Sequence, residues 1–79
     1  MSDVRNEVFE LIASTLDVRK SDITLDAKWE DQQADSFALV ELLVGVQEKF
    51  RIRFDPRELR NLKSVGDMVR VVERKVAKR

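Results

Sequence analysis

The chain has 79 residues, and its 15 lysines and arginines balance 15 aspartates and glutamates, so the formal net charge is zero. It contains no cysteine, no histidine and no tyrosine. These absences remove the commonest general base, a thiolate nucleophile and the usual zinc ligands, so we expect neither an enzyme nor a metal site. A neutral chain is also not typical of nucleic-acid-binding proteins, which are normally basic.

The length leaves room for one hydrophobic core, so we predict a single domain over residues 1–79. The first residues lack the apolar segment of a signal peptide. The longest apolar run, Leu42 to Val46, is far too short to cross a bilayer. We therefore expect a cytoplasmic protein without a membrane span.

The spacing of apolar residues predicts an all-α fold. Val4, Val8 and Ile12 recur with the period of a helix that buries one face. Asp55-Pro56 supplies the N-cap and the first residue of a short helix. The prediction is a small four-helix bundle, with three longer helices, one short helix and a long loop between helices one and two. The predicted helices span residues 3–15, 36–50, 56–61 and 65–76.

The connection from Asp17 to Asp35 has no clear period, and it lacks the Gly, Ser and Pro content of a flexible linker. Long loops of this kind are often functional. We expect its apolar residues, Val18, Ile23, Leu25 and Trp29, to pin it to the helices. Trp29 is the only tryptophan, and it is interpreted as a buried anchor.

The predicted helix 36–50 has two apolar stripes. One stripe contains Leu39, Leu42, Leu43, Val46 and Phe50, and the other contains Phe37, Val40 and Val44. A small domain has difficulty burying both sides of one helix, so the second stripe either contacts a partner or packs on the long loop. The sequence favours neither alternative.

Phe50-Arg51-Ile52-Arg53-Phe54 alternates as a strand does, but the chain offers no second strand to pair with it. An extended connector that buries Phe50, Ile52 and Phe54 is therefore predicted.

The loop meets the apolar helix at Ala34-Asp35-Ser36-Phe37. Asp35 and Ser36 are both good N-cap residues, and capping is the simplest interpretation. A phosphate attached to the Ser36 hydroxyl would also be stabilised there, because it would lie at the positive end of the helix dipole.

Motifs along nearly the whole chain resemble those of acyl carrier proteins. They are Ala34-Asp35-Ser36, Val40-Glu41-Leu42, Glu48-Lys49-Phe50 and Ser64-Val65-Gly66-Asp67, together with Ile52 and Phe54. The resemblance implies that Ser36 carries 4'-phosphopantetheine, with Asp35 beside it. A separate phosphopantetheinyl transferase would supply the group from coenzyme A with a magnesium ion. The group ends in a thiol that holds an acyl cargo as a thioester.

The resemblance also implies a monomer that presents its cargo to a ligase, ketosynthase or acyltransferase of fatty acid, polyketide or specialised lipid biosynthesis. Phe37, Val40 and Val44 would form the partner contact, rimmed by Glu41 and Glu48. The alternatives are an aminoacyl or peptidyl carrier, and a helical interaction module in which Ser36 only caps the helix. An enzyme with Ser36 as nucleophile has only a lysine such as Lys28 as a conceivable base.

Several residues depart from the family pattern. Gln33 and Asp17 stand where the family has glycine, Phe37 replaces leucine, and Ala38 and Gln47 replace acids. Positive charge follows the second helix at Arg51, Arg53, Arg57, Arg60 and Lys63. These departures predict a specialised rather than a housekeeping carrier, with Arg53 and Arg57 among its partner contacts. The alternative is that these cations pair with Glu58 or only keep the surface of the domain hydrated.

Overall fold

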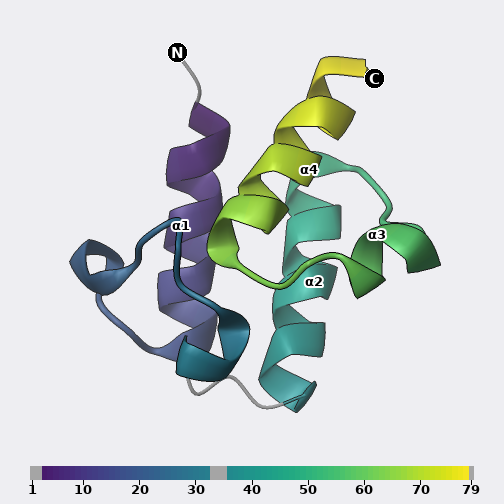
Figure 1. The fold of residues 1–79 in the computed structure, drawn as a ribbon. Coiled ribbons are helices and arrows are strands. Elements are labelled where there is room, and N and C mark those ends of the chain that lie inside the picture. Colours follow the sequence, from purple (N-terminus) through teal and green to yellow (C-terminus); the bar gives the residue numbers. More distant parts are fainter. Residues whose placement is uncertain (1–2, 33–35, 79) are drawn as a thin grey trace.

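The computed structural model describes residues 3–32 and 36–78. These residues form four α-helices and no strand, which confirms the predicted all-α fold with three longer helices and one short helix (Figure 1). Two 3-10 turns, η1 and η2, lie in the long loop and were not predicted. The elements are α1 (Asp3–Leu16), η1 (Lys20–Asp22), η2 (Trp29–Gln32), α2 (Ser36–Phe50), α3 (Pro56–Arg60) and α4 (Val65–Lys78).

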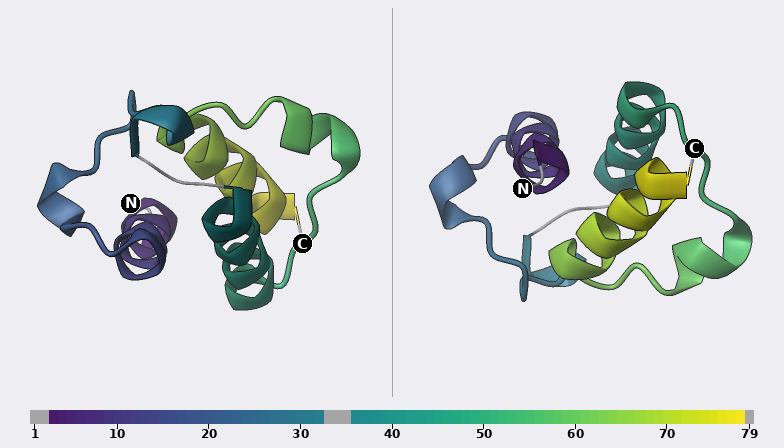
Figure 2. Two further views of the ribbon diagram at one scale, coloured as in Figure 1. Left: turned by 90° about the horizontal axis from the view of Figure 1, so that it is seen from below. Right: turned by 90° about the horizontal axis from the view of Figure 1, so that it is seen from above.

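The three longer helices pack together and α3 lies at the edge of the bundle. Viewed along the bundle, α1, α2 and α4 surround one core, and α3 stands outside them beside the connector from α2 (Figure 2). α2 runs antiparallel to α1, so its first residue lies at the end of the domain opposite the described start of α1 and end of α4 (Figure 1). The first and last turns of α2 therefore face opposite ends of the molecule.

The core draws on one stripe from each long helix. The side chains with no exposed surface are Val8, Ile12, Leu42, Val46, Val65, Met68 and Val72. The hydrophobic effect is proportional to the apolar area removed from water, so these residues supply much of the stability of the bundle. They match the apolar spacing that predicted the helices.

Two helices end in the same way, through a residue with a left-handed backbone. Asp17 and Arg51 both have φ of 57°. The N–H of Val18 donates to the carbonyl of Ala13 at 3.1 Å, and the N–H of Ile52 donates to the carbonyl of Gln47 at 3.1 Å. This is the Schellman arrangement, which normally has glycine at the left-handed position.

The long loop is attached to the start of α4 by backbone hydrogen bonds. The N–H groups of Val65 and Gly66 donate to the carbonyls of Ala27 and Leu25 at 2.9 Å and 2.8 Å. The carbonyls thereby satisfy two N–H donors that the helix itself leaves unpaired. Trp29 is 6% exposed, which confirms its expected burial as the anchor of the loop.

The connector after α2 is extended, as predicted. Phe50, Ile52 and Phe54 are all buried. The N–H of Phe54 donates to Oε1 of Gln47 at 3.0 Å, so the α2 side chain holds the connector against its own helix. Asp55 then caps α3 in a reciprocal capping box with Glu58.

Candidate functional site

Ser36 is the first residue of the 15-residue helix α2. Its backbone therefore lies at the positive end of the helix dipole, where a phosphate ester is stabilised. Asp35 lies outside the described residues, as do Gln33 and Ala34 and the side chain of Ser36. The roles predicted for Asp35 and for the Ser36 hydroxyl stay predictions.

Burial of one face fixes the orientation of α2. Leu42 and Val46 have no exposed surface. Nζ of Lys49 lies 3.5 Å from a carboxylate oxygen of Glu7, which adds an ion pair between α2 and α1. With this face turned inward, the opposite face of the helix is directed away from the core.

The second apolar stripe of α2 is exposed to solvent. Phe37 is 72% exposed, Val40 56% and Val44 46%. The alternative that Val40 and Val44 pack on the long loop is therefore wrong. Glu41 and Glu48 are exposed as well. The structure thus brings together an apolar stripe with acidic side chains on the same helix, and the stripe begins one residue after Ser36.

A groove lies beside the last turn of α2. It has a volume of about 570 Å³ and is lined by Val44, Gln47, Glu48, Arg51, Ile52 and Arg53. It brings Val44, Glu48 and Arg53 together, three of the residues that the sequence placed in a partner contact. Arg57 is exposed on α3 and does not line this groove.

The profile of the family described as "Phosphopantetheine attachment site" matches residues 6–72. An acyl carrier protein of Exiguobacterium sibiricum is 39% identical over 71 residues, covering 89% of this chain and 90% of the relative. The chain belongs to the acyl carrier protein family. Acyl carrier proteins of Wolinella succinogenes and Porphyromonas gingivalis are also similar, at 33% identity over 69 residues and 31% over 75 residues. These alignments cover 86% and 94% of this chain, and 91% and 96% of the two relatives.

Members of the acyl carrier protein family are carriers and not enzymes, and the group that they carry is 4'-phosphopantetheine. The residues present fit this group, which has a phosphate at one end and a long flexible chain beyond it. The start of α2 provides the positive end of a long helix for the phosphate. Phe37 and Val40 provide exposed apolar surface beside it.

Two further properties bear on the carrier site. Within residues 3–32 and 36–78, no group of acidic side chains has an arrangement that could hold a metal ion. None of the helices in that part of the chain combines the length and the apolar character needed to cross a bilayer.

Sequence reasoning missed two features next to the site. Gln47 holds the connector, and so helps to shape the groove. Lys75 and Lys78 of α4 line a second hollow, which Arg51 and Arg53 also line. The spacing of Lys75 and Lys78 by three residues could have indicated a basic face on α4. Only the tertiary fold places that face beside the connector.

Proposed function

We propose that this chain carries an acyl group on 4'-phosphopantetheine attached to Ser36, and that it presents the cargo to enzymes of fatty acid, polyketide or specialised lipid biosynthesis. It would act as a monomer in the cytoplasm. The observation that carries the proposal is the place of Ser36, at the start of a long helix whose exposed apolar stripe begins at the next residue.

Attachment is a phosphoryl-type transfer at the serine oxygen. A phosphopantetheinyl transferase would use coenzyme A as donor. The Ser36 oxygen would form a bond to phosphorus, the hydroxyl proton would leave, and the nucleotide half of coenzyme A would depart. The positive end of the α2 dipole would stabilise the resulting phosphodiester anion. When bound, the group supplies a terminal thiol that can hold an acyl cargo as a thioester.

The partner contact would be the exposed stripe of α2, with Phe37, Val40 and Val44 at its centre and Glu41 and Glu48 on the same helix. An apolar centre with a charged rim is the usual anatomy of a transient interface. A tethered cargo meets each partner at a raised effective concentration, so such an interface can be weak and still be productive.

The test of attachment is incubation with coenzyme A and a promiscuous phosphopantetheinyl transferase, read by intact-protein mass spectrometry. Wild type and Ser14→Ala, which removes an exposed serine of α1, should gain the mass of the group. Ser36→Ala should not. Modification of Ser36→Ala to the same extent as wild type would place the group elsewhere and overturn the proposal.

The test of the partner contact is the double variant Val40→Asp/Val44→Asp in the modified protein. We expect acyl transfer to a partner ketosynthase to fall by about tenfold or more, because charge at the centre of an interface is strongly unfavourable. The matched control is Ser14→Asp/Ser21→Asp, which adds the same charge at exposed residues of α1 and η1. Equal losses in the two variants would show that the α2 stripe has no special role.

A further inference from the structure

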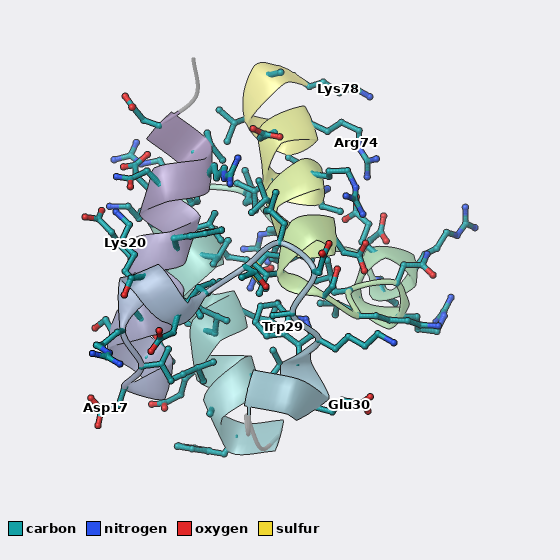
Figure 3. The ribbon with its side chains drawn as sticks, turned by 60° about the vertical axis from the view of Figure 1, so that its left-hand side comes forward. Asp17, Lys20, Trp29, Glu30, Arg74 and Lys78 are labelled. Atoms are coloured by element: carbon teal, nitrogen blue, oxygen red, sulfur yellow. The ribbon has the colours of Figure 1, made fainter. Side chains whose placement is uncertain are left out.

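Charge is divided sharply between the two parts of the chain. Residues 1–48 contain eleven acidic and four basic residues, whereas residues 49–79 contain four acidic and eleven basic residues. The division is spatial in part, because α1 and η1 lie on one side of the bundle and the connector and α3 lie on the other (Figure 2), whereas the end of the long loop meets Lys63. The side chains of Arg74 and Lys78 extend from α4 on the side away from Asp17 (Figure 3). The neutral total conceals a strongly dipolar domain.

We name five exposed cations of the connector, α3 and the turn after it the basic surface. They are Arg51, Arg53, Arg57, Arg60 and Lys63. Among the side chains that the structure describes, none of the five has an ion-pair partner.

Two acids close to the basic surface, on α3 and at the start of α4, pair with cations of α4, whereas Glu48 lines the groove together with Arg51 and Arg53. Glu58 lies 2.9 Å from Lys75 and 3.5 Å from Arg74, both on α4. Asp67 pairs with Arg70, and its carboxylate accepts hydrogen bonds from the N–H groups of Lys63 and Ser64. The alternative that these cations pair with Glu58 is therefore wrong. The charge of the basic surface has no ion-pair partner among the described side chains.

Hollows flank the basic surface where it meets α2 and α4. The groove of about 570 Å³ lies on the α2 side, and a second hollow of about 310 Å³, lined also by Lys75 and Lys78, lies on the α4 side. Arg51, Ile52 and Arg53 line both hollows. Val44, at the end of the exposed apolar stripe of α2, also lines the groove on the α2 side. A protruding apolar side chain of a partner could enter the first groove. Carboxylates of the partner on either side of it could then pair with the arginines of the basic surface.

We propose that the basic surface binds an acidic face of a partner enzyme, which inserts an apolar side chain into the groove beside Val44. The inference rests on the proposed carrier function and names the charge of its partner. It places this contact on the second half of α2, which runs from about 12 Å along the helix from Ser36, at Val44, to about 21 Å, at Phe50. Partner enzymes would then recognise the start of α2, where the group is attached, and the basic surface as two separate contacts.

The groove favours a protein over an anionic membrane as the occupant. Val44 and Ile52 line it, so a protruding apolar side chain can fill it. A lipid headgroup plane offers no apolar protrusion of that kind. Exposed charges act mainly on the rate of encounter and on the rejection of wrong partners, so the proposal predicts selectivity for acidic faces and sensitivity to salt.

The test uses the unmodified full chain and two forms of one probe. The probe is a fatty acid synthase ketosynthase with a basic carrier-docking face, together with a variant in which that face is reversed to glutamate. The carrier variant is Arg53→Glu/Arg57→Glu/Arg60→Glu. The matched control, Arg5→Glu/Arg19→Glu/Lys20→Glu, makes the same change in net charge on the α1 side. Wild type, the triple variant and the control are each measured against both probes, six combinations in all, by biolayer interferometry at low and high salt, after circular dichroism has checked the fold.

Wild type and control should associate about tenfold faster with the acidic-faced probe than with the basic-faced probe, and salt should reduce the difference. The triple variant should reverse this preference. If the glutamate variant does not fold, the corresponding Arg→Gln triple variant is measured instead. That variant should abolish the preference. Equal association of wild type with both probes, or a control that reverses as the triple variant does, would overturn the inference.

Sedimentation with vesicles of phosphatidylserine and phosphatidylcholine tests the alternative that the basic surface binds an anionic membrane. Binding by wild type that the triple variant loses and the control keeps would assign the basic surface to lipid and overturn the inference. Because these measurements use unmodified protein, they do not depend on Ser36. A failure of the attachment test would therefore be distinguishable from a failure here.

Discussion

The carboxylate of Glu58 on α3 lies 2.9 Å from Nζ of Lys75 on α4. The same carboxylate accepts a hydrogen bond of 2.9 Å from the backbone N–H of Asp55 and lies 3.5 Å from Arg74. One side chain therefore completes the N-terminal cap of α3 and joins this short helix to α4. α3 has no buried residue of its own, so we expect its attachment to depend on this carboxylate.

We predict that Glu58→Gln lowers the free energy of unfolding by about 1–2 kcal/mol, because the amide can still accept one hydrogen bond but loses the ionic attraction. Urea denaturation followed by circular dichroism measures the change. Glu73→Gln is the control, since Glu73 has no ion pair among the described side chains. A similar loss in both variants would contradict the role of Glu58.

The same carboxylate predicts a dependence of stability on pH. Burial acts to raise the pKa of Glu58, but the hydrogen bond from Asp55 and the pairing with Lys75 outweigh it, so the pKa lies below its ordinary value of 4.5. A lowered pKa in the folded state gives stability that is present above the unfolded pKa and is lost as the pH falls through the folded pKa. Wild type should therefore lose more stability than Glu58→Gln between about pH 5 and about pH 3. Parallel pH profiles would argue against this assignment.

The left-handed residues at the ends of α1 and α2 predict a gain of stability. Asp17→Gly and Arg51→Gly should each raise the free energy of unfolding by about 0.5–1 kcal/mol, because glycine adopts a positive φ without steric cost. Thermal unfolding of each variant measures this. Ser14→Gly, inside α1, is the control and should lose about 0.5 kcal/mol, since glycine is less favourable than serine in a helix. Destabilisation by Arg51→Gly would contradict the prediction.

The two glycines of the chain should respond in opposite ways to alanine. A Cβ at Gly66 would lie 2.9 Å from the backbone oxygen of Leu25, whereas a Cβ at Gly45 would have its nearest contact at 3.9 Å, with a Leu11 methyl. Gly66→Ala should cost about 1–3 kcal/mol, because the backbone of the loop must shift. Gly45→Ala should gain about 0.5–1 kcal/mol from helix propensity. Chemical denaturation of the pair checks both signs, and a stable Gly66→Ala would mean that the loop moves easily.

Trp29 provides a test of how firmly the loop is held. Trp29→Ala should cost about 3–5 kcal/mol, the usual loss for a large buried aromatic side chain. The fluorescence of wild type should be blue-shifted, since the indole is 6% exposed. Leu59→Ala, at a side chain 41% exposed, is the comparison and should have little effect. Emission at the wavelength of water-exposed tryptophan together with unchanged stability would refute the anchoring role.

The sequence predicted the helices because the buried stripes of α1, α2 and α4 repeat with the helical period. It missed η1 and η2, since three- and four-residue turns carry no periodic signal. It could not decide whether Val40 and Val44 are buried, because both stripes of α2 are apolar, and only the packing of α1 and α4 selects the inner one. The partner of Glu58 was not predictable either, as Lys75 is 17 positions away and reaches it only through the tertiary fold.

The carrier site was predicted from sequence motifs, whereas the fold was predicted from the spacing of apolar residues. The motif around Ser36 and the resemblance along the chain led to the acyl carrier protein family, which the matches to relatives confirm. The hydrogen bonds from α4 to the long loop leave no pattern in the sequence, because they join backbone groups. The proposed partner contact rests on unpaired surface charge, and the sequence shows charges without showing which of them are already paired.

The most direct test of the central claim is intact-protein mass spectrometry of the chain purified from its native host, followed by fragmentation to locate any added group. We expect one 4'-phosphopantetheine on Ser36, with an acyl group on its thiol in part of the population. Unmodified protein from a host that contains a cognate phosphopantetheinyl transferase, or a group found on any other residue, would contradict it.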